Sequence, residues 1–277
     1  MVEDYGINFD EKILAEAWML AAHKDGSSII ANGKYAGKTF REYLGHKDFP
    51  ILIKFLDVQD NLSVQVHPSD DYAQKFEGQL GKHEFWYILD AAPDAFIYRG
   101  LNRNVTKEEF VARIKENTLE EILQKVPVKK GDSFFIPAGT IHSTGKGILL
   151  AEVQRNSNVT YRIYDYGRKR ELHIDKALDV ADLKPFDNGS ESYPHLVACE
   201  YFTVDKINLD GKITSRIEGN VMAESFLSVL ILDGHGKIAV EGETLTYKKG
   251  DSFFIPANSG HWAIEGIADA LLTTISE

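Results

Sequence analysis

The sequence predicts a mainly β protein made of two related β-barrels with a few short helices. One observation is a series of short apolar runs separated by turn-forming Gly, Asp and Asn residues, which is typical of sandwiches and barrels. The runs that we interpret as strands are residues 51–58, 62–67, 84–90, 133–137, 226–233 and 270–276. A second observation is an internal repeat, because the decapeptide KKGDSFFIPA at residues 129–138 recurs unchanged at residues 248–257.

The composition is that of a folded, soluble protein. Hydrophobic residues make up 43% and charged residues 26% of the 277 residues, so the chain can bury a sizeable core and does not belong to the disordered class. The net charge of −11 argues against nucleic acid or an anionic membrane as a partner, since both favour a basic surface. A small anionic ligand stays open, because a few cations converging in a pocket can hold one phosphate.

No targeting or membrane segment is expected. The N-terminal residues lack a basic stretch followed by an apolar run, so they do not resemble a signal peptide. No apolar run approaches the ~18–20 residues that cross a bilayer. The single cysteine, Cys199, excludes a disulfide framework and a cysteine-cluster metal site. We therefore expect a cytoplasmic protein.

Short helices are expected between the strands of the first barrel. Residues 106–109 and 118–121 each have the Thr-x-x-Glu form of a capping box, followed by apolar residues spaced for one helix face. Ser69 and the aspartates after it could cap another helix that runs through Phe76, and residues 174–181 also have a helical pattern.

The repeated decapeptide predicts a turn, a strand and a second turn. The Gly-Asp pairs at residues 131–132 and 250–251 would make the first turn, and the Pro-Ala pair that ends each copy would start the second. A histidine follows each copy by four residues, His142 and His261, at the expected start of the next strand. This pattern resembles the second motif of cupins, small jelly-roll barrels that often hold a metal. On this pattern alone, a metal ligand and an ordinary barrel histidine are equally open interpretations.

The first barrel supplies further side chains that suit a metal. Gln65 and His67 are two residues apart on an expected strand, so both leave it on one face. Glu84 opens a later strand, and with His142 the set offers two imidazoles, one carboxylate and one amide oxygen. This set suits zinc, with one position left open for water or substrate. His83 would point to the opposite face from its neighbour Glu84, so it is left out.

The second barrel lacks such partners. No Gln-x-His or His-x-His pair precedes His261 in residues 226–243. His235 stands in an Asp-Gly-His-Gly turn signature and is expected to face solvent, while Glu241 and Glu243 lie near a glycine-rich turn. We therefore predict one metal site, in the first barrel, with the second barrel in a supporting role.

Several motifs occur together in a fixed order along the chain. They are EAWMLAAH, NLSVQVHP, GKHEFWYIL, KKGDSFFIPAGTIH and NSNVTYRIYDYGR. In this order, from about residue 16 to residue 180, they resemble the short bacterial form of type I mannose-6-phosphate isomerase (phosphomannose isomerase). The resemblance implies a zinc-dependent interconversion of mannose 6-phosphate and fructose 6-phosphate on a cupin fold.

The resemblance also implies roles for individual residues. The implied zinc ligands are Gln65, His67, Glu84 and His142; Arg162 would act in catalysis and substrate binding, Glu152 in proton transfer, and Ser63 and Lys82 in phosphate binding. Met19, Ala21 and Asn158 depart from the family pattern, where Glu, Ser and Asp are common. None of the three is an implied ligand, so they bear on substrate contacts and not on the metal.

Aldose–ketose isomerisation moves a proton between C2 and C1 through an enediol. It requires a base near those carbons and a positive group for the developing oxyanion. The implied zinc and Arg162 could carry that charge, and Glu152 is the first candidate base. A carboxylate beside a metal and an arginine would have a lowered pKa, so we expect Glu152 to be ionised. The alternative is a structural salt bridge from Glu152 to Arg162 or Arg155.

Other charged residues have two interpretations each. Arg162 could belong to a solvated face with the basic residues 168–170, although its tyrosine neighbours favour an enclosed position. Lys54 lies in an apolar strand and is either a second pocket cation or a barrel-end lysine. His173 precedes a helical pattern and has a structural or surface role.

The domain boundary is expected in the turn-forming residues 187–190. Residues 1–188 would be an N-terminal catalytic cupin domain with the short helices, and residues 189–277 a C-terminal degenerate cupin domain. The expected partner is a small-molecule sugar phosphate, with no nucleic acid and no membrane, and the protein would be a monomer or homodimer.

Two other functions stay open. A His/Glu/His set can also hold Fe(II), as in a cupin dioxygenase, although Lys82 and Arg162 favour a phosphorylated ligand. A non-catalytic, metal-dependent sugar-phosphate binding cupin would keep the metal barrel and lack the proton carrier, and here both Glu152 and Arg162 are present.

Overall fold

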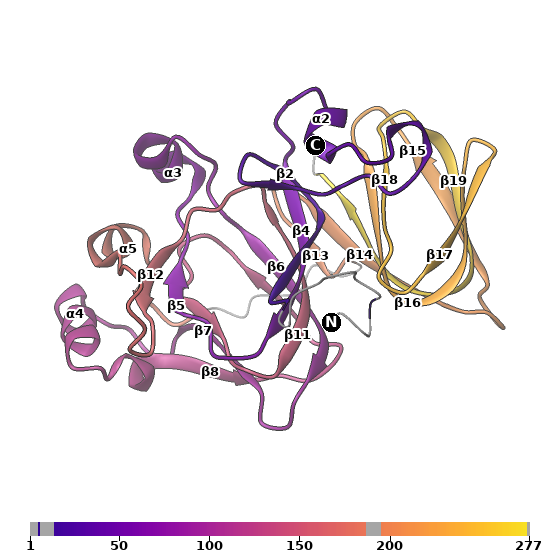
Figure 1. The fold of residues 1–277 in the computed structure, drawn as a ribbon. Helices are drawn as coiled ribbons and strands as arrows, with labels where there is room; N and C mark the ends of the chain where they lie inside the picture. The colour runs from indigo at the N-terminus through magenta and orange to yellow at the C-terminus, as the bar shows by residue number, and fades with distance from the viewer. Residues whose placement is uncertain (1–4, 6–13, 187–194, 276–277) are drawn as a thin grey trace. The chain divides into compact units, whose positions relative to one another are not determined.

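The computed structural model describes Tyr5 and residues 14–186 and 195–275, which form two compact units (Figure 1). Residues 15–186 belong to one unit, and residues 195–275 belong to the other together with Tyr5 and Leu14. The linker expected at residues 187–190, and with it the expected domain boundary, lies outside the described residues.

The first unit contains two five-stranded antiparallel sheets. The first sheet has the order β1 (Glu16–Leu20), β4 (Ile51–Val58), β11 (Ile148–Arg155), β6 (Glu84–Ala91) and β9 (Ser133–Ile136). The second has the order β12 (Tyr161–Tyr164), β5 (Val64–Val66), β10 (His142–Thr144), β7 (Phe96–Leu101) and β8 (Leu123–Pro127). Most neighbours in each sheet are far apart in the sequence, as expected for a jelly roll. A short hairpin, β2 (Ala22–His23) with β3 (Gly26–Ser27), completes the strands of this unit.

Apolar side chains from both sheets pack together between them. Leu56 of β4, Trp86 of β6, Leu150 of β11 and Ile97 of β7 belong to one buried cluster. Because side chains alternate along a strand, the residues beside these on the same faces also point between the sheets. Polar residues on these inner faces near the cluster, such as Glu84 and Glu152, are therefore buried between the sheets.

Helices cover the outer face of the second sheet. Val64 and Val66 of β5 share a buried cluster with Phe110, Leu119 and Ala177. The helical elements of this unit are η1 (Gly33–Tyr35), α2 (Phe40–Tyr43), α3 (Asp70–Glu77), α4 (Lys107–Lys115), η2 (Leu119–Ile122) and α5 (Ile174–Val180). None of the helices in the described part of the chain is long and apolar enough to cross a membrane.

The two capping-box patterns behave differently. Thr106 caps α4 by accepting a hydrogen bond from the backbone nitrogen of Glu109, so a helix forms there. The prediction of a helix after residues 118–121 is wrong. η2 is a single 3₁₀ turn without a side-chain cap, and it ends where β8 begins. Pairing of β8 with β7 takes the following apolar residues into the sheet.

The second unit contains one seven-stranded antiparallel sheet (Figure 1). Its central path is β13 (Val197–Ala198), β14 (Thr203–Asp210), β19 (Gly260–Thr274), β16 (Leu227–Val240) and β17 (Glu243–Lys248), while β15 (Arg216–Val221) pairs with β19 and β18 (Ser252–Ile255) pairs with β16. Each half of the long strands β16 and β19 pairs with a different outer neighbour. The sheet encloses its own core, which includes Val229, Ile238, Trp262 and Ile264.

His235 does not lie in the expected turn. It lies inside β16, opposite Ile267 and Lys248, and it is exposed as expected. Its neighbour Gly234 has a φ of 104°, and a Cβ there would lie 2.1 Å from the backbone oxygen of Ile267. The glycine that looked like a turn former instead permits close approach of two strands.

The repeated decapeptide forms the same local structure in both units. The backbone nitrogens of Lys129 and Lys248 donate to the carboxylates of Asp132 and Asp251, each over 2.9 Å. Each copy continues into a four-residue strand, Ser133–Ile136 and Ser252–Ile255, with the same pattern of burial. The predicted turn and strand are therefore confirmed in both copies.

Candidate metal centre

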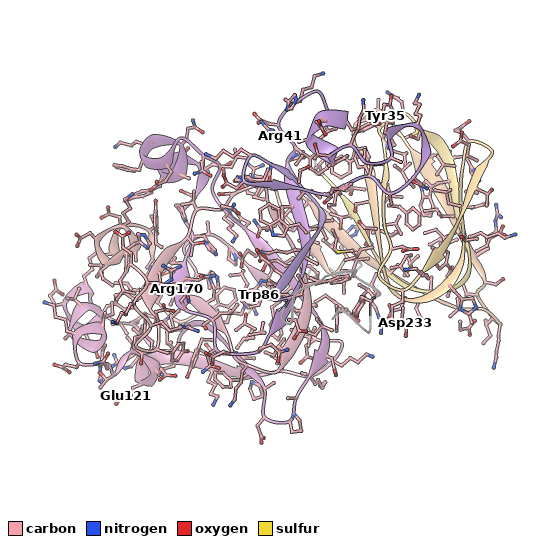
Figure 2. The ribbon with its side chains drawn as sticks, viewed as in Figure 1. Tyr35, Arg41, Trp86, Glu121, Arg170 and Asp233 are labelled. Atoms are coloured by element: carbon pink, nitrogen blue, oxygen red, sulfur yellow. The ribbon has the colours of Figure 1, made fainter. Side chains whose placement is uncertain are left out.

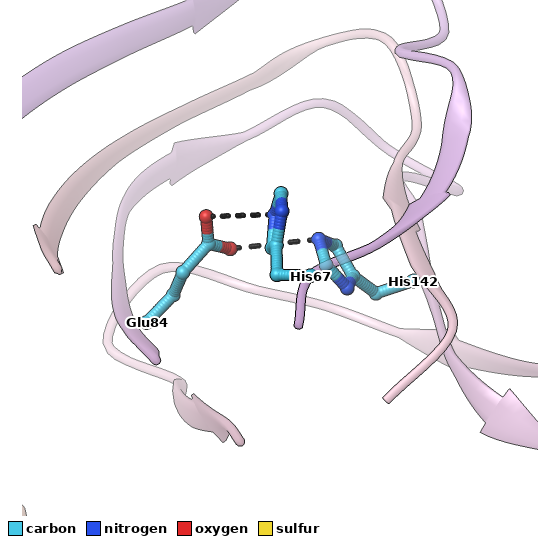
Figure 3. Close-up of side chains that lie close together, drawn as sticks. All are labelled: His67, Glu84 and His142. Carbon is cyan, nitrogen blue, oxygen red and sulfur yellow. Dashed lines mark ion pairs between the residues drawn. The ribbon is translucent and has the colours of Figure 1, made fainter. Parts of the chain in front are cut away.

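Three side chains from separate elements converge inside the first unit (Figure 3). His67 follows β5, while Glu84 and His142 are the first residues of β6 and β10. The Nε2 atom of His67 lies 3.2 Å from Glu84 Oε1, and that of His142 lies 3.5 Å from Glu84 Oε2. Each of the three residues is 1% exposed, so water competes little for these atoms.

The two imidazoles present lone pairs to this centre. The Nδ1 atoms of His67 and His142 each lie 2.8 Å from a backbone oxygen, of Val159 and Thr140 respectively. Because a carbonyl only accepts, Nδ1 carries the proton and Nε2 is left as an acceptor. Burial, followed by the charge of Lys82, lowers the pKa of His67 to about 3, and burial lowers the pKa of His142.

The carboxylate of Glu84 is ionised. Burial alone would raise its pKa, but the charge of Lys82, with Nζ 2.9 Å from Oε1, holds the pKa well below its usual range. Two neutral imidazoles and a carboxylate thus aim acceptor atoms at one another, and His67 Nε2 and Glu84 Oε2 have no hydrogen-bond partner among the described residues. A cation between them would satisfy all three groups.

Gln65 lies beside this centre. It is directly opposite His142 on the neighbouring strand, and its Nε2 lies 3.3 Å from His142 Nε2. Ser63 donates from its hydroxyl to Gln65 Oε1 over 3.4 Å and is itself buried. Ligation through the amide oxygen would require a rotation of this amide by about 180°.

Glu152 belongs to a polar row on the inner face of the first sheet. It lies opposite Trp86 on β6 and opposite Lys54 on β4. Its Oε2 accepts a hydrogen bond of 3.0 Å from Trp86 Nε1, and its Oε1 is 3.1 Å from Lys54 Nζ. Lys54 also lies 3.4 Å from Glu16 Oε2, at the more exposed end of the row. Figure 2 labels Trp86 among the strands of this unit.

The alternative interpretation of Glu152, a salt bridge to Arg162 or Arg155, is wrong, because its ion pair is with Lys54. Burial and then the charge of Glu84 raise the pKa of Glu152, and Lys54 lowers it less; the lowered pKa was expected of this carboxylate beside a bound metal and an arginine. Trp86 also packs edge-on against His142, with ring centroids 5.5 Å apart, so one indole contacts both a candidate ligand and this carboxylate.

Arg162 lies beside the centre on the second sheet, which also carries Gln65 and His142. It lies on β12 directly opposite Gln65. Its Nη1 donates to the backbone oxygen of Glu171 over 2.8 Å, while its buried Nε has no hydrogen-bond partner among the described residues. Nearby Arg168 and Arg170 both pair with Asp165, so this part of the unit is positively charged. Burial and then Arg170 lower the pKa of Arg162.

One cationic residue beside His142, Arg99, was not singled out from the sequence. Arg99 of β7 lies opposite His142, donates to the backbone oxygen of Phe135 over 2.7 Å and stacks 3.9 Å from the ring centroid of Phe186. Its signal in the sequence was a charged residue inside the otherwise apolar run of residues 96–101, whereas its place opposite His142 follows only from the strand register. His83 accepts from the backbone nitrogen of Ala138, and His173 accepts from that of Arg162, so both have structural contacts.

The second unit does not repeat this centre. The side chain of His261 is 54% exposed and lies 3.4 Å from Glu218. Within the described ranges, the one group of three or more His, Cys, Asp or Glu side chains suited to a metal is His67, Glu84 and His142. Identical decapeptides thus precede one buried and one exposed histidine.

Comparisons with known proteins agree along the whole chain. Residues 4–96 match the catalytic domain of phosphomannose isomerase type I, and residues 193–274 match the cupin domain of mannose-6-phosphate isomerase. Mannose-6-phosphate isomerase ManA of Bacillus subtilis is 37% identical, with 98% of this chain and 92% of the relative covered. The mannose-6-phosphate isomerase of Streptococcus mutans is 34% identical, with 99% and 93% covered.

Solved structures agree as well. The mannose 6-phosphate isomerase from Bacillus subtilis superposes with a TM-score of 0.85 at 36% identity, covering 98% of this chain and 93% of that one. A mannose 6-phosphate isomerase bound with zinc and yttrium has a TM-score of 0.74 at 16% identity, covering 100% and 95%, which shows a shared fold.

Proposed function

Because the chain belongs to the type I mannose-6-phosphate isomerase family, we propose that it interconverts mannose 6-phosphate and fructose 6-phosphate with one zinc ion bound in its first unit. The observation that carries this proposal is the buried convergence of His67, Glu84 and His142, in which His67 Nε2 and Glu84 Oε2 have no hydrogen-bond partner among the described residues. A zinc-bound relative with the same fold supports the choice of metal.

His67, Glu84 and His142 would hold the zinc, and Gln65 would be a fourth ligand after rotation of its amide. Bound there, zinc would supply a Lewis acid that anchors the hydroxyl and carbonyl oxygens at C1 and C2 of the sugar. The bonds from Nδ1 of each histidine to a backbone carbonyl keep both rings in the tautomer and orientation that ligation needs.

Glu152 would transfer the proton between C2 and C1. Proton transfer is most effective when the pKa of the base lies near the working pH, and the raised pKa of Glu152 moves it in that direction. Trp86 and Lys54 hold the two carboxylate oxygens, so the base is oriented before substrate arrives. The same carboxyl group would deliver the proton to the neighbouring carbon.

Arg162 would stabilise the negative charge that develops on the enediol oxygens. Its Nε has no partner among the residues that the structure describes, and it lies across from Gln65 at the edge of the centre. Ser63 and Lys82 remain the proposed phosphate contacts. Lys82 would have a second role, because its contact with Glu84 keeps that carboxylate ionised.

The proposal is tested by measuring conversion of mannose 6-phosphate to fructose 6-phosphate, together with metal analysis, before and after chelation. We expect turnover with one zinc per chain, loss of both on chelation, and recovery on addition of zinc. Zinc-loaded protein that binds mannose 6-phosphate without converting it would refute the isomerase and favour the binding protein. Iron in place of zinc, with oxygen consumption, would favour the dioxygenase.

A further inference from the structure

One side chain outside the centre links the two segments that carry His67 and Glu84. Asp70 is the first residue of α3, three positions after His67. Its Oδ1 accepts a hydrogen bond of 2.7 Å from the backbone nitrogen of Gly81, and its Oδ2 lies 2.7 Å from Arg155 Nη2. Arg155 also donates from its backbone nitrogen to the oxygen of His83 over 3.1 Å. Arg155 therefore contacts both segments, Asp70 through its side chain and His83 through its backbone.

The two segments are in direct backbone contact. A Cβ on Gly81 would lie 2.4 Å from the backbone carbon of Ser69 and 2.5 Å from the nitrogen of Asp70. One residue further, the nitrogen of Lys82 donates to the oxygen of Pro68 over 3.1 Å. No side chain separates the segments at this point, so a shift of Asp70 moves both of them.

The end of β11, which carries Arg155, and the residues that follow it contact both of the segments that carry His67 and Glu84. Gln154 lies directly opposite Glu84. Ser157 donates from its hydroxyl to the oxygen of Leu80 over 2.7 Å, and Val159 provides the oxygen that orients His67. Among these contacts with the two ligand segments, the ion pair of Arg155 and Asp70 is the one between charged side chains. The Arg155 side chain is only 13% exposed.

We propose that Arg155 is a positioning residue for the metal centre, which acts through Asp70 to set the separation of His67 and Glu84. The inference rests on the proposed zinc site. Two ligands held at the wrong separation bind a metal less tightly even when both remain present, and loss of an outer contact typically weakens metal affinity about 10–100-fold. Arg155 touches neither the sugar nor the metal in this role.

The test is an equilibrium zinc titration of metal-free protein against a chromogenic chelator, with the rate of zinc release measured alongside. We expect Arg155→Met and Asp70→Asn each to weaken zinc binding about 10–100-fold and to speed release. Because the two act as a unit, the double variant should bind no more weakly than Arg155→Met, and Arg155→Lys should recover part of the loss.

The matched control breaks an ion pair at the other end of the same helix. Lys176 Nζ lies 2.6 Å from Glu77, the last residue of α3, and Lys176→Met should leave zinc affinity unchanged. Wild-type affinity in Arg155→Met, or equal weakening in Lys176→Met, would overturn the positioning role. If Arg155→Met does not fold, Asp70→Asn carries the same test, since its amide oxygen can still accept from Gly81. Wild-type protein that binds no zinc would overturn the metal centre and this inference together.

Discussion

Replacing Lys54 by methionine should make catalysis depend strongly on pH. Methionine keeps the apolar stem in the inner face of β4 and removes the charge that lies 3.1 Å from Glu152 and 3.4 Å from Glu16. The side chain of Glu16 is 42% exposed, so water replaces its lost partner at a cost of about 0–1 kcal/mol. The side chain of Glu152 is 3% exposed, so nearly all of the electrostatic effect of the substitution acts on Glu152.

The size of the effect follows from burial. Leaving one partner of a buried ion pair charged and unpaired costs about 3–5 kcal/mol. Protonation avoids this cost, so removal of Lys54 should raise the pKa of Glu152 further. A larger fraction of the Glu152 carboxyl groups would then be protonated at neutral pH and unable to act as a base, which should lower kcat by up to about 10²–10⁴-fold.

The assay is kcat for mannose 6-phosphate from about pH 6 to pH 9. Because removal of Lys54 raises the pKa of Glu152, the ionised base appears only at higher pH, and the variant should regain activity as pH rises. Lys54→Arg keeps the charge and should retain the wild-type profile, while Glu16→Gln should change it little. A loss in Lys54→Met that is the same at every pH would refute this reasoning.

The other predictions concern the candidate metal ligand Glu84, the guanidinium group of Arg162 and the second unit. Glu84→Ala should lose both zinc and activity, because it removes the one charged acceptor of the centre and leaves buried Lys82 unpaired; metal analysis checks this. Arg162→Ala should lower kcat about 10²-fold or more and retain zinc, and zinc loss would contradict the role assigned to Arg162. His261→Ala should leave zinc content and kcat unchanged, because its exposed side chain lies in the second unit, and a changed zinc content would argue for a second site.

Much of the first unit follows from patterns that are local in the sequence. The alternation of side chains along a strand placed Gln65 and His67 together, and the decapeptide turn placed His142 at the start of the next strand. The decapeptide has the same structure twice because its turn is closed by its own residues, Lys129 with Asp132 and their counterparts. Such contacts need no information from the rest of the chain.

Contacts between distant strands could not be predicted in this way. Lys54, Glu152 and Trp86 come from three strands far apart in the sequence, and only the register of β4, β11 and β6 makes them neighbours. The partner and raised pKa of Glu152 follow from that register and from burial, so the alternative interpretation of an arginine partner was wrong. The same limit explains the wrong helix prediction after residues 118–121, where β8 pairs with β7 in place of a continued helix.

The sequence by itself determined the candidate ligands, the turn–strand–turn units and the family, because these depend on residue type and short spacing. The tertiary structure decided which charged groups lie beside each ligand, which histidine is buried, and how Arg155 and Asp70 hold two ligand segments together. Both the solvation of a charge and the identity of its partners are set by chain segments that meet only when the sheets form.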